Sequence, residues 1–242
     1  YKSSAASDVY KRQGLSLVCS VIVSSAAIVL KPVQARNEEL FRQQIILDVA
    51  GLMEPGADIG QLFEAIETRT VDLDTGDYVD EGDLELSVAI PDDLDAAGIG
   101  QRPRFVPVYL VKDGNTIEQI ILPVYGKGLW STMLGYLSLA PDGNTIRGLR
   151  FYSHAETPGL GDQIDKEPWR SLWVGKEVYG SADEPQIRVV RGPVPAGAPD
   201  PQHLIDGMSG ATLTGNGVSG LVRYWTGSHG FGPYLKKYRE AG

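Results

Sequence analysis

The spacing of hydrophobic and polar residues divides the chain into an apolar N-terminal segment, two short helical stretches and a long middle of alternating runs. Residues 14–30, GLSLVCSVIVSSAAIVL, carry no charge, and their length is the minimum for a helix that crosses a bilayer core of about 30 Å. Residues 36–52 place apolar side chains at helical spacing and stop at Gly51. Residues 58–67 repeat that spacing, with Asp58 as the N-cap. We expect a membrane-crossing helix followed by two further helices.

Beyond residue 68 the pattern changes to short alternating or apolar runs, which are typical of β-strands. Two Asp-Gly-Asn turn signals, at residues 113–115 and 142–144, predict hairpins. A last helix is predicted from Thr214 to Tyr238, loosened by several glycines. Consecutive hairpins favour an α+β domain with an antiparallel sheet and flanking helices over a doubly wound parallel sheet. The predicted strands are residues 84–90, 105–111, 117–124, 133–139, 145–152 and 187–191.

The apolar segment is open to three interpretations. It can span the membrane, it can be the core of a signal peptide cleaved near Val33-Gln34-Ala35, or Cys19 can be a lipidation site, although Val18 is larger than the residue expected there. All three place residues after about 36 outside the cytoplasm or at the membrane. We expect a non-native or fragment edge at 1–13, a transmembrane helix at 14–35 and an extracytoplasmic α+β domain at 36–242, with Lys11 and Arg12 favouring an N-terminus inside.

Charge and composition exclude several classes of function. The formal net charge is −9, and residues 37–242 alone hold 17 Lys and Arg against 30 Asp and Glu, which argues against nucleic-acid binding. Cys19 is the only cysteine, so the chain forms no internal disulfide and no thiolate metal cage. The three histidines lie far apart in the sequence, and we predict no metal site.

The segment DGMSGATLTGNGVSG, residues 206–220, gathers one acid, several hydroxyls and five glycines ahead of the last predicted helix. It contains G-x-G-x-x-G from Gly215 to Gly220, the dinucleotide-binding fingerprint, but no strand of adequate length precedes it and too few residues follow it for a second strand. A serine hydrolase using Ser209 is disfavoured, because a nucleophile elbow needs Gly-x-Ser-x-Gly. Two explanations remain, a helix cap and a hydroxyl that carries a ligand.

A cap would use Ser209, Thr212 or Thr214 to bind the exposed amides of the first helical turn. It would not explain the small residues Gly210 and Ala211, which leave the hydroxyl of Thr212 accessible to another molecule. A phosphate bonded at a helix start is stabilised by unpaired amides and by the helix dipole, without a Lys or Arg. This agrees with the acidity of the chain.

The sequence Asp206-x-x-Ser209-Gly210-Ala211-Thr212 resembles the flavinylation motif of FMN-binding domains, in which the FMN phosphate is esterified to the final threonine. The likeness extends to YGKGLWS at 125–131, FYSHAETPGLG at 151–161, Trp169 and SGATLTGNGV at 209–218. Together these stretches resemble the C subunit of the Na+-translocating NADH:quinone oxidoreductases, in order and from about Gly14 onward.

The resemblance implies that a flavin transferase attaches FMN through its phosphate to Thr212, with Asp206 and Ser209 as recognition residues. It implies an FMN-binding region at about 117–225. Alongside Gly210 and Ala211, the residues expected around the cofactor are Gly128, Leu129, Trp130, His154, Glu156, Thr157, Gly159 and Leu160. Glu156 and Thr157 are expected to meet the flavin or its ribityl chain, whereas His154 suits a structural hydrogen bond equally well. A core tryptophan at a hairpin is the alternative interpretation of Trp130.

The function implied is electron relay within a bacterial inner-membrane complex that oxidises NADH, reduces ubiquinone and pumps Na+ outward. The protein would cross the membrane once, keep its main domain in the periplasm, contact membrane lipid and work only with the other subunits. Two alternatives remain open at this point: the flavoprotein subunit of an Rnf-type ferredoxin:NAD+ complex, and a free-standing exported FMN-binding electron carrier.

Overall fold

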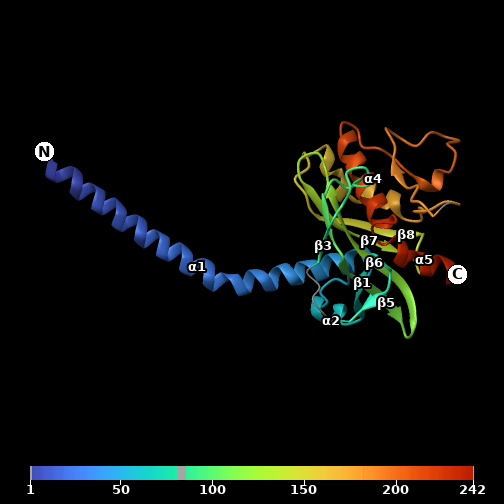
Figure 1. The fold of residues 1–242 in the computed structure, drawn as a ribbon, viewed down its shortest axis with the longest axis horizontal. Coiled ribbons are helices and arrows are strands. Elements are labelled where there is room, and N and C mark those ends of the chain that lie inside the picture. The colour runs from blue at the N-terminus through green and yellow to red at the C-terminus, as the bar shows by residue number, and fades with distance from the viewer. Residues whose placement is uncertain (1, 81–85, 182, 242) are drawn as a thin grey trace. The chain divides into compact units, whose positions relative to one another are not determined.

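The computed structural model describes residues 2–80, 86–181 and 183–241 of the chain (Figure 1). The fold consists of two compact units, Tyr1–Gln43 and Gln44–Gly242. The predicted strand at 84–90 begins outside the described residues, and the rest of it forms β3, Ser87–Ala89.

Helix α1 runs without interruption from Lys2 to Ala50 and contributes to both units. The helical stretch predicted at 36–52 is therefore the continuation of the apolar segment and not a separate element. Pro32 lies inside the helix, where it removes one backbone hydrogen bond without ending the helix. The helix ends where predicted, at Gly51, whose φ of +71° suits glycine at a helix C-terminus. Over Asp8–Ala50, α1 is long and apolar enough to cross a membrane, by length and composition.

The unit Gln44–Gly242 is built on an antiparallel six-stranded sheet in the order β2-β1-β5-β6-β7-β8. Two small sheets accompany it, an antiparallel pair of β3 with β4 (Gln101–Pro103) and a parallel pair of β9 (Arg188–Val189) with β10 (Leu204–Ile205). The strands of the large sheet are β1 (Ile66–Asp72), β2 (Tyr78–Val79), β5 (Phe105–Asp113), β6 (Thr116–Lys127), β7 (Thr132–Leu139) and β8 (Ile146–Ser153).

Both faces of the large sheet are covered by apolar side chains. In β6, Ile120 and Leu122 belong to the larger core cluster, which includes buried residues of the C-terminal helices. Ile121, between them, points the other way into a smaller cluster that contains Tyr136 and the last turns of α1. Burial on both faces explains why β6 is a nearly continuous apolar run.

The two predicted hairpins are confirmed, and each turn contains a glycine with positive φ. Gly114 joins β5 to β6 with φ +58°, and Gly143 joins β7 to β8 with φ +64°. The carboxylate of Asp142 accepts hydrogen bonds from the backbone N–H groups of Asn144 and Thr145, both at 2.8 Å. The Asp-Gly-Asn sequence therefore fixes the second turn by its own side chain.

The helix predicted at 58–67 is shorter than expected. Helix α2 spans only Ile59–Phe63, and Asp58 caps it as predicted by accepting a hydrogen bond from the backbone N–H of Gln61. Ile66, expected on the helix, instead begins β1 and pairs with Val111 of β5. Its side chain is buried in the smaller core cluster, so packing on the sheet outweighs the helical spacing.

The last predicted helix is two helices, α4 (Thr212–Thr226) and α5 (Gly232–Ala241). Residues 227–231 turn so tightly that a Cβ atom on Gly230 would lie 2.3 Å from the carbonyl oxygen of Trp225, and one on Gly232 would lie 2.5 Å from that of Gly227. The glycines that were expected to loosen one helix therefore separate two helices. Helix α4 also begins two residues earlier than predicted.

Helix α5 packs against the turn between β1 and β2. The hydroxyls of Tyr78, Tyr234 and Tyr238 form a triangle of hydrogen bonds of 2.8–3.0 Å. Burial raises the pKa of the Tyr234 hydroxyl, which keeps it neutral and able to donate. Lys237 Nζ donates to the carbonyl oxygen of Gly76 at 2.6 Å and pairs with the carboxylate of Asp77. These contacts join segments about 160 residues apart in sequence.

The glycines of G-x-G-x-x-G bring α4 against the neighbouring backbone. A Cβ atom on Gly217 would lie 2.5 Å from the carbonyl oxygen of Lys127 at the end of β6, and one on Gly220 would lie 2.2 Å from that of Ala96. The preceding strand, β10, has only two residues. The motif is thus a close-packed face of α4, and our expectation that these glycines loosen the helix is wrong.

This packing reverses the usual effect of a helical glycine. Alanine for glycine inside a helix normally stabilises by about 1 kcal/mol. We expect Gly217→Ala to lower the free energy of unfolding by about 1–3 kcal/mol, because the added methyl group meets a backbone atom that cannot move aside. Chemical denaturation of the domain measures this change in the free energy of unfolding. Gly215→Ala, which meets only a Val189 methyl group at 3.1 Å, is the control and is expected to change stability less.

Candidate cofactor-binding site

Thr212 is the first residue of α4, and its side chain is exposed. The N-cap is Ala211, and no side chain in the described structure caps the helix. The capping explanation for Ser209, Thr212 and Thr214 is therefore wrong. An accessible hydroxyl stands at a helix start whose amides have no side-chain cap and whose dipole favours a negative group.

The loop that leads to Thr212 is held by hydrogen bonds between Asp206 and two other segments of the chain. The carboxylate of Asp206 accepts a hydrogen bond from the backbone N–H of Val194 at 2.8 Å, and its carbonyl oxygen accepts one from Trp169 Nε1 at 2.9 Å. Asp206 thus ties two loops together. Gly210 has a φ of +73°, a conformation that glycine adopts easily, and Ala211 beside it is buried. Ser209 is exposed.

Glu156 is buried, and both oxygens of its carboxylate are bound by protein groups. Oε1 accepts hydrogen bonds from the backbone N–H groups of Leu129, at 3.0 Å, and Trp130, at 3.2 Å. Oε2 accepts one from the hydroxyl of Thr214 at 2.5 Å. Glu156 therefore connects the loop between β6 and β7 to the first turn of α4.

Trp130 lies on the surface, since 69% of its area is exposed, and the alternative interpretation of a core tryptophan is excluded. Its indole Nε1 donates to the hydroxyl of Thr157 at 3.0 Å. The loop is closed by a hydrogen bond from Gly128 N to Ser131 O, and Ser131 Oγ accepts one from the backbone N–H of Ala155. Two of the stretches that carried the resemblance, residues 125–131 and 151–161, thus contact each other.

The imidazole of His154 lies between two protein partners. Its Nε2 is 2.7 Å from Asp165 Oδ2, and its Nδ1 accepts the backbone N–H of Glu156 at 3.2 Å. A neutral ring with its proton on Nε2 satisfies both contacts. His154 thus makes the structural hydrogen bonds that were one of its two predicted roles.

The loop at Gly159 and Leu160 approaches the segment before Thr212. The backbone N–H of Gly159 donates to Asp162 Oδ1 at 2.7 Å, and a Cβ atom on Gly210 would lie 2.9 Å from Leu160 Cδ2. The structure therefore brings the predicted residues of all three loops to the N-terminal end of α4.

Four large apolar side chains are exposed on these loops and the first turn of α4, and we call them the apolar rim: Leu129, Trp130, Leu160 and Leu213. Leu213, 59% exposed, was not predicted, and neither was the buried contact of Thr214 with Glu156. The sequence Thr-Leu-Thr at a helix start could have indicated both the exposed Leu213 and the buried Thr214. Residues 212 and 214 project about 200° apart around a helix. One threonine must face the core if the other faces solvent.

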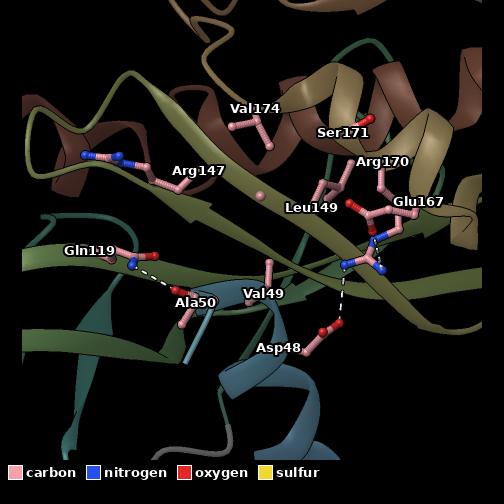
Figure 2. Close-up of a pocket in the computed structure, with 12 residues that line it drawn as sticks. Asp48, Val49, Ala50, Gln119, Arg147, Leu149, Glu167, Arg170, Ser171 and Val174 are labelled. Atoms are coloured by element: carbon pink, nitrogen blue, oxygen red, sulfur yellow. Dashed lines mark hydrogen bonds and ion pairs between the residues drawn. The ribbon is translucent and has the colours of Figure 1, made fainter. Parts of the chain in front are cut away.

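A separate cavity lies beside the last turn of α1 (Figure 2) and is lined by none of the predicted site residues. Figure 2 shows the Asp48 carboxylate facing Arg170, at 3.3 Å, and Gln119 donating to the carbonyl oxygen of Ala50 at 2.9 Å. Asp48 also pairs with Arg150 at 3.1 Å. Arg170 also pairs with Glu167, so ion pairs beside the cavity hold the end of α1 to the domain.

Comparison with known proteins shows which families the chain is similar to. Residues 128–227 match the FMN-binding domain family. The C subunit of the Na(+)-translocating NADH-quinone reductase of Yersinia pestis is 43% identical over 93% of this chain and 90% of its own length. The protein of that name from Neisseria meningitidis serogroup A is 44% identical, over 94% of this chain and 92% of its own.

A crystal structure of Shewanella oneidensis NqrC superimposes with a TM-score of 0.75 at 31% identity, covering 87% of this chain and all of that one. A second crystal structure, of the C subunit of the Na(+)-translocating NADH-quinone reductase from Parabacteroides distasonis, gives a TM-score of 0.66 at 26% identity, over 85% of this chain and 96% of that one. The chain therefore belongs to the family of C subunits of the Na(+)-translocating NADH-quinone reductases.

Proposed function

We propose that this chain is an electron-relay subunit of a Na+-translocating NADH:quinone reductase and that it carries FMN covalently, through the phosphate, on Thr212. The observation that carries the proposal is the exposed hydroxyl of Thr212 as the first residue of an α-helix that no described side chain caps. A phosphodiester formed there meets free amides and the positive end of the helix dipole. The site thus needs no basic side chain to hold an anion.

The residues around Thr212 suit the rest of the cofactor. The apolar rim offers an aromatic ring and three leucines to a flat heterocycle, and Thr157 and Ser209 supply hydroxyl groups near it. When bound there, FMN supplies the electron-accepting and electron-donating chemistry. The chain's own side chains orient it, exclude water from one side of it and keep it from diffusing away.

We infer that maturation needs a flavin transferase acting on FAD. The hydroxyl oxygen of Thr212 forms a bond to the phosphorus of the FMN half, the pyrophosphate bond breaks, AMP leaves and the hydroxyl proton is lost. Asp206 and Ser209 serve as recognition residues in this proposal. Because the Asp206 carboxylate already accepts a backbone hydrogen bond, we assign it the task of holding the acceptor loop.

We further propose that residues 14–35 cross the bacterial inner membrane and that residues 36–242 lie in the periplasm. The apolar, exposed side chains of α1 support the crossing, and the positions of Lys11 and Arg12 support this orientation. Electrons then reach and leave the flavin through other subunits, and covalent attachment retains FMN where the cytoplasmic pool cannot replace it.

The test of this function is coexpression with a flavin transferase, followed by denaturing electrophoresis under ultraviolet light. A fluorescent band at the mass of this chain is expected, and mass spectrometry of tryptic peptides should place one FMN on the peptide that contains residues 206–220. Flavin that separates from the chain on denaturation would contradict covalent attachment. Flavin on another peptide would contradict the acceptor.

A further inference from the structure

Glu156 holds a buried carboxylate that has no cationic partner among the ion pairs of residues 2–80, 86–181 and 183–241. Only 4% of the residue is exposed, and the groups that stabilise its charge are two backbone amides and one hydroxyl. Burial of a carboxylate is costly unless such donors compensate it. Since three donors converge on it from two separate segments, the site is built around this group.

Two glycines make room for the carboxylate. A Cβ atom on Gly128 would lie 2.3 Å from Glu156 Oε1. A Cβ atom on Gly161 would lie 2.7 Å from Thr214 Oγ1 and 3.1 Å from Glu156 Oε2. Both glycines belong to the loops that surround the N-terminal end of α4, and these loops can close around the Glu156 carboxylate and the Thr214 hydroxyl because neither position carries a side chain.

We propose that Glu156 is a positioning residue with two effects. Its carboxylate fixes the Leu129–Trp130 loop against the first turn of α4, and it places a buried negative charge two residues along that turn from Thr212. The proposal rests on the proposed function, because the second effect concerns a flavin attached to Thr212. It differs from direct contact with the cofactor, since both carboxylate oxygens are already bound by the protein.

The sign of the electrostatic effect follows from charge alone. Reduction adds negative charge to a flavin, and a buried carboxylate nearby raises the free energy of the reduced form. Glu156 therefore lowers the reduction potential of the attached flavin. Removing the charge while keeping the geometry should raise that potential.

The positioning effect is tested first in the protein without flavin, by acrylamide quenching of tryptophan fluorescence. Trp130 is the exposed tryptophan, whereas Trp169, Trp173 and Trp225 are at most 6% exposed, so quenching reports mainly on its loop. We expect Glu156→Ala and Thr214→Val each to raise the quenching constant by up to about 1.4-fold, the ratio of full to present exposure of Trp130, because the loop opens locally. Thr214→Ser, which restores the hydroxyl, should return it to the wild-type value. Wild-type quenching in both Glu156→Ala and Thr214→Val would overturn the proposal.

The electrostatic effect is tested with Glu156→Gln in the flavin-loaded chain. A glutamine oxygen can accept both backbone amides while its amide group donates to Thr214 Oγ1, so the contacts stay and the charge is lost. We expect the flavin of Glu156→Gln to have a higher midpoint potential than that of the wild-type chain. The tryptophan quenching constant of this variant should equal the wild-type value. An unchanged potential in a fully loaded variant would overturn the proposal. Failure of the wild-type chain to take up flavin would instead refute the proposed function, while the quenching series still tests the positioning role.

Discussion

Thr212→Ala is expected to abolish covalent flavin attachment completely. The substitution removes the oxygen that forms the phosphodiester, and no neighbouring hydroxyl can replace it: Ser209 lies before the helix and Thr214 is buried and bound to Glu156. The readout is the fluorescent band under ultraviolet light after coexpression with the transferase. Because Thr212 is exposed and caps nothing, the free energy of unfolding should change by less than about 0.5 kcal/mol.

Two variants serve as controls for this result. Ser228→Ala removes an exposed hydroxyl near the other end of α4 and should leave the band intact. Thr212→Ser keeps the hydroxyl and should retain fluorescence at a reduced level. A fluorescent band in Thr212→Ala would show that another side chain accepts the flavin.

The second large effect is expected from truncation within α1. Removing residues 1–43 should leave a soluble, cooperatively folding domain, whereas removing residues 1–50 should unfold it. Ile45, Ile46, Leu47 and Val49 are each at most 5% exposed and pack on Ile66, Ile121 and Tyr136 of the sheet. Each such side chain contributes about 1.5–3 kcal/mol, so their loss approaches the about 5–15 kcal/mol that stabilises a domain.

Thermal and urea unfolding of the two truncated proteins would measure this difference. Asp48→Ala in the longer protein isolates the ion pairs with Arg150 and Arg170, and it should cost less than loss of the whole turn. Equal midpoints for the two truncated proteins would show that the last turn of α1 contributes nothing to the fold. A domain that stays with membranes after removal of residues 1–43 would contradict a single anchor.

The hairpins and the antiparallel sheet could be predicted from the sequence because they depend on local signals. Gly114 and Gly143 both adopt positive φ within their Asp-Gly-Asn turns, and the Asp142 side chain also fixes the second turn. Strand periodicity then places the flanking runs correctly to within a few residues. The helix end at Gly51 also followed from local signals, and the start of α4 at Thr212 was predicted to within two residues.

Features that depend on distant partners could not be predicted. The contact between Glu156 and Thr214 joins residues 58 positions apart, and nothing local marks either side chain as buried. Ile66 left its expected helix because β5 offered a strand partner. The glycines of α4 look alike in sequence, and only the backbone of Lys127 and Ala96 shows why Gly217 and Gly220 must lack a side chain.

The contact between α5 and the β1–β2 turn has a consequence for biogenesis. Tyr78 and Asp77 lie early in the domain, and their partners Tyr234, Lys237 and Tyr238 follow every other element in chain order. During synthesis, the early strands must wait for α5 before this part of the sheet is closed. Under the proposed function, a transferase that selects the folded domain acts only after residues 232–241 have been translocated, which makes flavin loading a late checkpoint in assembly.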